Sequence, residues 1–339
     1  MSQVAIENPV IFHATLPTPS QFPVQPATWY LFCRSSELRD KPVSKTILGH
    51  RMVAFRDSHG NVSILDAHCA HLGADLGRGR VRGDCLQCPF HHWSYSQQGK
   101  CVSIPQATSI PDSAKLRVYP AVERHGYVFF FLGSEPLFPL PFFSDCDPDE
   151  FVASQTFTFP MDAPWFMLVG NGFDGQHFQS VHDRKLTGPP VVDCPDRYAR
   201  RMRFDAEVVG HSIFDRLLKR FVGKFVRVSI TSWGGPFVLV EGKFGRAHSR
   251  LLVASRPVDP SNTLSHVMVF AKKSSSRLFD HLSLRTRRRF TQAFLQYDID
   301  KLRGVRYQPA GLTPQDAELI EYFRWVADLP RSDYEELAP

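Results

Sequence analysis

The feature that most constrains this chain is a pair of short motifs, each of which combines one cysteine with one histidine. Cys69 and His71 are separated by one residue, Cys88 and His91 by two, and sixteen residues lie between the motifs. This spacer contains four glycines, at positions 73, 77, 79 and 83. Because glycine adopts left-handed backbone conformations at little cost, such a spacer allows two loops to fold toward one point. The sequence therefore predicts that the four side chains meet in one metal site.

A site with two thiolates and two imidazoles has few chemical interpretations. Two cysteine sulfurs can hold one iron of a [2Fe–2S] cluster while two neutral histidine nitrogens hold the other, and the imidazoles raise the reduction potential. Cys85 and Cys88 also form a CxxC pair, which is typical of zinc sites, and packed cysteines beside surface histidines are a third interpretation. A zinc knuckle requires neither histidine at these two spacings nor a glycine-rich spacer. The pattern favours the iron–sulfur cluster.

A second group of polar residues lies further along the chain, where Asn171, Asp174, His177 and His182 occur within twelve residues. Two histidines five residues apart diverge by about 140° on a regular helix, so both reach one metal only if the helix ends or distorts between them. Two imidazoles and a carboxylate on one side of a metal leave its other positions open, as in Fe(II) sites that bind dioxygen. The segment is therefore a candidate mononuclear iron site, although such histidine pairs also occur without a metal.

Both segments resemble the motifs of one protein family. Residues 66–105 (DAHCAHLGADLGRGRVRGDCLQCPFHHWSYSQQGKCVSIP) are similar to the Rieske domain of Rieske non-haem iron oxygenases, and residues 171–182 match that family's catalytic-domain pattern NxxDxxHxxxxH. Ala70 stands where the family usually has proline, and His92 where it usually has glycine. Neither difference removes a ligand, and we expect the His92 side chain to lie in solvent. Cys85 and Cys101 are expected to be packed thiols.

The resemblance implies an α+β fold: an N-terminal β-rich Rieske domain followed by a catalytic domain with a curved antiparallel sheet packed on helices, in a helix-grip-like arrangement. We place a proline-rich extension at residues 1–27, the Rieske [2Fe–2S] domain at 28–140 and the mononuclear iron domain at 141–339. Local patterns predict a strand over Ile47–Arg56 and a late helix over Phe290–Leu302. The basic, amphipathic segment His211–Arg227 is expected to form a helix or a lid over the site, with a membrane-surface helix as the less favoured alternative.

The family also implies which side chains bind the two cofactors. The cluster ligands would be Cys69, His71, Cys88 and His91, and the mononuclear iron would be held by His177, His182 and a carboxylate late in the chain. We expect that carboxylate to be Asp298, which follows Phe294 by four residues on the apolar face of the late helix, with Asp300 as the alternative.

Two further residues acquire roles by the same resemblance. Asp174 would connect His91 of a neighbouring subunit to His177 and carry electrons between the two centres, because a carboxylate that accepts both imidazole N–H groups fixes both rings. This arrangement implies a homotrimer. Asn171 is placed near the iron.

The resemblance predicts an enzyme: the oxygenase component of a Rieske non-haem iron monooxygenase-type system that uses O2. Its cofactors would be a [2Fe–2S] cluster and mononuclear Fe(II), with electrons from a separate ferredoxin and/or NAD(P)H-dependent reductase. The motifs look closer to the branch containing 3-ketosteroid 9α-hydroxylase and cholesterol 7-desaturase, which implies hydroxylation or desaturation of a bulky hydrophobic molecule, steroid-like or polycyclic/aromatic. The alternative is a Rieske-type electron-transfer protein with an inactive catalytic domain.

Composition and charge add expectations about partners and location. With 43% hydrophobic residues the chain can bury a core, and its net charge of +6 alone identifies no partner. The basic run at residues 285–289 is expected to be a solvated helix face, and no motif indicates nucleic acid. No apolar run is long enough to predict a transmembrane segment, and the first basic residue is Arg34, so we expect neither a membrane span nor a signal peptide. The seven cysteines, an odd number, favour a reducing cytoplasm.

Overall fold

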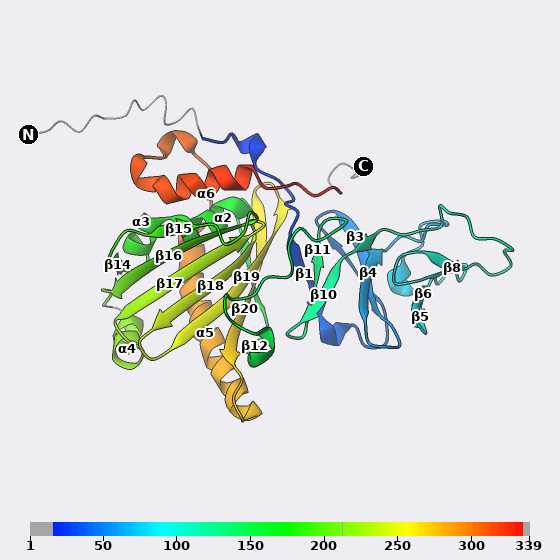
Figure 1. Ribbon diagram of the computed structural model, residues 1–339, viewed down its shortest axis with the longest axis horizontal. Coiled ribbons are helices and arrows are strands. Elements are labelled where there is room, and N and C mark those ends of the chain that lie inside the picture. The colour runs from blue at the N-terminus through cyan, green and yellow to red at the C-terminus, as the bar shows by residue number, and fades with distance from the viewer. Residues whose placement is uncertain (1–15, 212, 335–339) are drawn as a thin grey trace, which may run out of the picture. The chain divides into compact units, whose positions relative to one another are not determined.

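The structure is a computed structural model that describes residues 16–211 and 213–334, and these form two compact units (Figure 1). The N-terminal unit contains residues 27–140 and the chain from Ser332 onward. The C-terminal unit contains residues 141–331 and the chain up to Pro26. Of the extension expected at residues 1–27, residues 1–15 lie outside the described residues, and the part from residue 16 to Pro26 groups with the C-terminal unit. There Phe22 stacks on Phe166, with ring centroids 4.1 Å apart.

The N-terminal unit is built from three small antiparallel sheets. The first has the order β1–β11–β10, with β1 at Trp29–Arg34, β10 at Ala121–Arg124 and β11 at Tyr127–Phe131. The second has the order β2–β3–β4–β9, with β2 at Val43–Ile47, β3 at His50–Arg56, β4 at Val62–Asp66 and β9 at Val118–Tyr119. The third has the order β5–β6–β7–β8, with strands at Arg80–Arg82, Cys85–Gln87, Ser94–Tyr95 and Cys101–Ser103. Every residue of β11 is buried, as its uninterrupted apolar sequence predicts.

The strand predicted over Ile47–Arg56 is wrong in one respect, because a tight turn divides it. Leu48 and Gly49 both have positive φ, +53° and +80°, and Ile47 pairs directly with His50. The segment thus supplies β2's last residue and all of β3. Glycine accepts such a φ without strain, and this single residue is the local signal for the turn.

The C-terminal unit is dominated by a nine-stranded antiparallel sheet with the order β12–β20–β19–β18–β17–β16–β14. Two short strands attach to this path, β13 on β20 and β15 on β16. The bounds are β12 Phe151–Ala153, β13 Phe157–Met161, β14 Arg184–Leu186, β15 Val191–Asp193, β16 Ala199–Val208, β17 Phe225–Trp233, β18 Phe237–Phe244, β19 His248–Asp259 and β20 Asn262–Lys272. Ile230, Val240 and Leu251 are directly paired across the neighbouring strands β17, β18 and β19. Paired residues of neighbouring strands project to the same face of a sheet, so these three side chains share one face.

Helices cover this sheet, and the longest of them determines the site. Figure 1 shows α5 (Arg277–Leu302) running across one face of the sheet, where it packs on β20 and β13. The others are α2 (Trp165–Gly170), α3 (Gly175–Ser180), α4 (Ile213–Phe221) and α6 (Ala317–Ala327). The expected helix over Phe290–Leu302 is therefore the second half of a longer one. The expected α+β architecture, a β-rich unit followed by an antiparallel sheet packed on helices, is confirmed.

The helix expected over His211–Arg227 is shorter than predicted. Helix α4 ends at Phe221, Gly223 has a φ of +133°, and β17 already begins at Phe225. The amphipathic pattern continues past the helix because β17 begins with alternating exposed and buried residues, which supply the same mixture of apolar and basic side chains. A backbone angle that glycine alone accepts readily ends the helix here.

An ion pair joins the glycine-rich spacer of the N-terminal unit to its second sheet and gives a pH prediction. Asp75 Oδ2 lies 2.6 Å from Arg51 Nη2, and its Oδ1 accepts a hydrogen bond from the Gly77 amide at 2.8 Å. Burial alone would raise the pKa of Asp75, but these two donors outweigh it and hold the pKa below its ordinary value. A depressed native pKa contributes stability above the unfolded-state pKa and loses it as pH falls through the native value.

We therefore expect Asp75→Asn to lower the free energy of unfolding by about 1 kcal/mol near neutral pH, since the pair is partly exposed. The difference from wild type should shrink below a pH of about 4, where the wild-type carboxyl also becomes protonated. Urea unfolding at a series of pH values measures this, with the exposed Asp112→Asn as the matched control. A difference that stays constant down to acid pH would contradict the assignment.

Candidate functional site

The four Cys and His residues of the first motif pair lie on two loops of the N-terminal unit. One loop follows β4 and is closed by the Cys69 amide, which donates to the Ala74 carbonyl at 3.0 Å. The other follows β6 and is closed by the Cys88 amide, which donates to the Trp93 carbonyl at 2.8 Å. Both cysteines are buried.

The histidines of the two loops face each other. His71 Nδ1 lies 3.1 Å from His91 Nδ1, and both rings are exposed. Two neutral imidazoles that present the same nitrogen to each other at this distance are best explained by a positive centre that both nitrogens bind. The Trp93 indole stacks on the His71 ring, with centroids 4.6 Å apart and an angle of 3°. Two buried sulfurs and two facing nitrogens are a donor set that fits a [2Fe–2S] cluster.

A hydroxyl group lies beside one of these sulfurs. Tyr95 Oη is 3.1 Å from Cys69 Sγ and accepts a hydrogen bond from the Ala70 amide at 3.1 Å. Burial, together with the neighbouring Cys69 sulfur, raises the pKa of Tyr95 well above its ordinary value. The phenol therefore keeps its proton, and with Cys69 bound to the cluster as a thiolate it would donate a hydrogen bond to the sulfur. Nothing in the sequence motif marked Tyr95, since it belongs to a short strand outside both Cys/His pairs.

This contact predicts an effect on the reduction potential. A hydrogen bond to a ligand sulfur stabilises the reduced, more negative cluster, so we expect Tyr95→Phe to lower the midpoint potential. If the bond is worth about 1 kcal/mol in favour of the reduced form, the shift is about 40 mV for one electron. Direct electrochemistry measures it. Tyr119→Phe, which removes a hydroxyl that donates to Asp66 at 2.9 Å, is the control and should leave the potential unchanged.

The remaining cysteines and His92 do not join this donor set. All seven cysteines are free, so Cys85 and Cys101 form no disulfide. His92 is exposed, as expected, and has a φ of +59°. A left-handed backbone at this position explains why glycine is the usual residue of the resembled family there.

The second group of polar residues lies where two short helices of the C-terminal unit meet. A 3-10 turn at Asn171–Phe173 follows α2, and Asp174 then starts α3 by accepting hydrogen bonds from the Gln176 and His177 amides at 2.9 and 3.1 Å. Helix α3 ends at Ser180, two residues before His182. The expectation that the helix ends between the two histidines is confirmed, and their Nε2 atoms come within 3.0 Å of each other.

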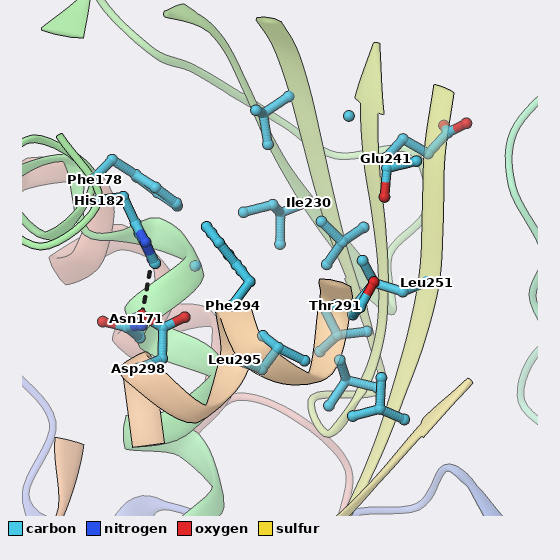
Figure 2. A pocket seen from close by; sticks show the side chains of 18 of the residues that line it. Asn171, Phe178, His182, Ile230, Glu241, Leu251, Thr291, Phe294, Leu295 and Asp298 are labelled. Carbon is cyan, nitrogen blue, oxygen red and sulfur yellow. Dashed lines mark ion pairs between the residues drawn. The ribbon is translucent and has the colours of Figure 1, made fainter. Parts of the chain in front are cut away.

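Helix α5 brings a carboxylate to these histidines. Asp298 Oδ1 lies 2.9 Å from His182 Nε2 and 3.4 Å from His177 Nε2, and Figure 2 shows Asp298 facing His182 beside Asn171. Asp300 is exposed and instead accepts a hydrogen bond from Gln296 at 3.1 Å. The structure thus brings together Asp298, and not Asp300, with both histidines.

The donor atoms of this triad fit a metal ion. One ligand atom from each residue lies within 4.8 Å of the other two, and the residues are largely buried. Asp298 Oδ1 is buried without a hydrogen-bond partner of acceptable geometry among the described residues. Burial would raise the pKa of Asp298, but His177 and His182 outweigh it and lower the pKa, so the carboxylate stays ionised. Two imidazoles and one carboxylate form the facial donor set that suits Fe(II).

Two other predicted residues lie at this triad. Asn171 Nδ2 is 3.0 Å from His177 Nε2, and Asn171 lines the cavity described below. Asp174 is half-buried, and its described contacts are those of a helix cap, with the backbone amide of His177 among them. The cap is the ordinary structural role that an aspartate has at this position.

Neighbouring side chains hold the histidines in place, and sequence reasoning missed most of them. The His182 ring stacks on Phe294 with centroids 4.4 Å apart, and Phe178 stacks less closely on it at 6.1 Å. The Arg184 guanidinium donates to the His182 carbonyl at 2.6 Å and to Asp215 of α4 at 3.0 Å, in a buried ion pair. The only sequence signal for this pair is a charged residue close after His182, because Asp215 comes from a separate helix.

A cavity of about 710 Å3 opens beside the triad within the C-terminal unit. Its walls are mainly apolar, and Figure 2 shows Ile230, Leu251, Phe294 and Leu295 around the same space. This volume lies within the range of small-molecule sites in proteins. The sequence did not reveal these lining residues, because an alternating apolar strand gives the same pattern whether it faces a packed core or a cavity.

Comparisons with known proteins agree with the two-part description. The Rieske [2Fe-2S] domain family matches residues 28–120. Aminopyrrolnitrin oxygenase PrnD of Pseudomonas fluorescens is 42% identical over 46% of this chain and 46% of its own length. A 3-ketosteroid-9-alpha-monooxygenase oxygenase component of Rhodococcus rhodochrous is 41% identical over 30% of this chain and 26% of its own, and cholesterol 7-desaturase of Drosophila melanogaster is 30% identical over 70% and 54%. The matches thus span about a quarter to a half of these relatives' lengths.

Solved structures show the fold over nearly the whole chain. Dicamba monooxygenase bound to dicamba is 20% identical, with a TM-score of 0.59 over 88% of this chain and 95% of that one. Pseudomonas putida NdmA with theobromine is 21% identical, with a TM-score of 0.63 over 94% and 91%. The resemblance to Rieske oxygenases is confirmed, and the expected cofactors agree with a [2Fe-2S] domain and a three-residue metal site. Among the described residues, no helix combines the length and apolar character needed to cross a bilayer.

Proposed function

We propose that this protein is the oxygenase component of a Rieske non-haem iron monooxygenase-type enzyme. The domain family supports a cluster held by Cys69, His71, Cys88 and His91. The observation that carries the proposal is the second site, where His177, His182 and Asp298 converge in the wall of a large apolar cavity. A pure electron carrier needs neither a vacant coordination face nor a cavity for a small molecule.

The iron, when bound by His177, His182 and Asp298, supplies the site for O2 activation next to the substrate. The chain's own residues orient the ligands, exclude water and bind the substrate. Phe294 and Phe178 keep the His182 ring in its orientation, and the apolar walls exclude water from the reacting carbon. Asn171 offers an amide beside the histidines that can hold a polar atom of the bound molecule. For hydroxylation, substrate R–H, O2, two electrons and two protons give R–OH and water.

The cavity supports a bulky, mainly apolar substrate, steroid-like or polycyclic/aromatic. Most of its lining residues are apolar, so recognition rests mainly on shape and on exclusion of water, while polar side chains such as Glu241, Ser255 and Thr291 can orient a bound molecule. Three of the relatives named above are an oxygenase, a monooxygenase and a desaturase, which supports hydroxylation or desaturation.

We infer that electrons come from a separate ferredoxin and/or NAD(P)H-dependent reductase, which fits the one-electron chemistry of the cluster. We infer that Asp174 transfers them to the iron site of a homotrimer, from His91 of one subunit to His177 of the next. The half-buried position of Asp174 at the start of the His177 helix supports this role. The seven free cysteines support a reducing cytoplasm as the location.

The test begins with the purified protein. Iron and acid-labile sulfide should show a [2Fe–2S] cluster together with an additional, separately removable iron. A panel of apolar molecules, added with a generic reductase pair and NAD(P)H, should include some that trigger O2 uptake and yield a hydroxylated or desaturated product. A protein that contains only the cluster and consumes no O2 with any reductant would instead support the inactive electron carrier.

A further inference from the structure

The mouth of the cavity is defined by the lining residues that reach the surface. Phe221, His248 and Phe290 are exposed, whereas the metal-binding triad at the other part of the cavity is largely buried. These three residues come from the end of α4, the start of β19 and the middle of α5. Entry to the cavity therefore runs between these three segments.

The three segments contact one another and form a continuous rim. The Arg246 amide donates to the Val222 carbonyl at 3.1 Å, which ties the β18–β19 turn to the end of α4. Arg287 Nη1 donates to the His248 carbonyl at 2.6 Å, which ties α5 to the same turn. The rim is thus one surface.

Large apolar side chains project from this rim into solvent. Phe221 is 65% exposed and Phe290 52%, and both line the cavity. Phe225 is 57% exposed, but it lies on the opposite face of β17 from the lining residue Val226. Single exposed apolar residues are ordinary, but two phenylalanines at one apolar opening form a patch of the kind that marks an interaction surface.

The rim is also basic. Arg220, Lys224, Arg246 and Arg289 are exposed around the phenylalanines. Lys224 pairs with Glu207 at 2.8 Å, but Arg220, Arg246 and Arg289 have no ion-pair partner among the described residues. Lys224 also lies over the Phe225 ring, 5.2 Å from its centroid. Exposed aromatic rings interleaved with unpaired cations are complementary to a surface that has an anionic outer layer over an apolar interior.

We propose that this rim binds the surface of an anionic phospholipid bilayer. Phe221 and Phe290 enter the boundary between headgroups and acyl chains, and the arginines contact the lipid phosphates. The cavity mouth then faces the bilayer, where apolar molecules concentrate. Substrate entry from the lipid rests on the proposed function, whereas bilayer binding itself does not.

An acidic protein is the competing partner for a basic rim. It would satisfy the arginines but would give no reason for two exposed phenylalanines, Phe221 and Phe290, to flank the opening of an apolar cavity. An anionic bilayer by itself accounts for both the exposed arginines and the exposed phenylalanines at the cavity mouth. Association of this kind is reversible, because neither a lipid anchor nor a spanning helix is involved.

Vesicle co-sedimentation of the full-length protein tests the proposal without any measurement of turnover. Wild type should sediment with vesicles of phosphatidylcholine and phosphatidylserine and much less with phosphatidylcholine alone, and added salt should weaken binding. Phe221→Ser and the double variant R220E/R246E should each reduce partitioning, the latter at least about tenfold. Phe279→Ser removes an equally exposed phenylalanine near the start of α5 and is the matched control.

Each result supports or overturns the proposal. If wild type does not sediment with anionic vesicles, or if the rim variants bind as well as Phe279→Ser, bilayer binding by this rim is wrong. Loss of vesicle binding together with rim-dependent binding of an acidic ferredoxin would assign the surface to a protein partner instead. The cluster absorption spectrum of every variant verifies that it is folded. Turnover of a water-soluble substrate, measured separately, reports on the proposed function alone.

Discussion

Asp298→Ala should abolish substrate turnover while the visible spectrum of the [2Fe–2S] cluster stays unchanged. The variant removes the only carboxylate that the structure places against His177 and His182 within the described residues. Even residues that merely support metal ligands change affinity by about 10–100-fold, so loss of a ligand should reduce iron affinity by at least about a hundredfold. Iron analysis should show loss of the mononuclear iron and retention of the cluster.

Asp300→Ala is the matched control for this experiment. It lies two residues away on the same helix, is exposed, and accepts one hydrogen bond from Gln296. We expect turnover and iron content close to those of wild type. If Asp300→Ala loses the iron and Asp298→Ala keeps it, the triad is assigned wrongly. If Asp298→Ala destroys the cluster as well, the two centres are not independent.

Asp174→Asn should reduce steady-state turnover by at least about a hundredfold while both cofactors remain bound, because the amide cannot hold two imidazole N–H groups as a carboxylate does. Asparagine is as good a helix cap as aspartate, so the start of α3 and the stability of the protein should be preserved. Rapid mixing of the reduced protein with O2 and substrate should show a cluster that reoxidises slowly.

The helix-capping role of Asp174 supplies the necessary control. Asp147 caps the 3-10 turn Pro148–Glu150 by accepting a hydrogen bond from the Asp149 amide at 2.9 Å. Asp147→Asn should leave turnover and cluster reoxidation unchanged. If Asp174→Asn behaves in the same way, Asp174 is a structural cap only, and electrons reach the iron by another route.

The two histidines, His177 on α3 and His182 just after it, illustrate how far sequence reasoning reaches. Their spacing required the helix to end between His177 and His182, and it does so at Ser180. That prediction depended only on helix geometry over a few residues. The turn at Leu48 and Gly49 and the early end of α4 were missed, because a continuous apolar or amphipathic pattern conceals a single residue with a positive φ.

The residues around the site were harder to predict because they come from distant segments. Tyr95 of β7 reaches Cys69 in the loop after β4, and Asp215 reaches Arg184 from a separate helix. The walls of the cavity alternate as buried strands do, so nothing local separates a lining residue such as Leu251 from a core residue. Exposure of Phe221 and Phe290 at the mouth depends on where α4 ends and on how α5 packs on the sheet.

The amino-acid sequence alone determined the chemistry, because donor types and their spacing within short loops are local properties: two thiolates with two imidazoles, and a separate histidine pair on a broken helix. The apolar face of the late helix already favoured Asp298 over Asp300, and the tertiary structure brings Asp298 to the histidines. Tertiary structure alone decided how large a space lies beside the site and where that space opens. Those outcomes depend on how α5 packs against a sheet formed by strands far away in the chain, and packing of this kind sums many weak contacts that no short segment encodes.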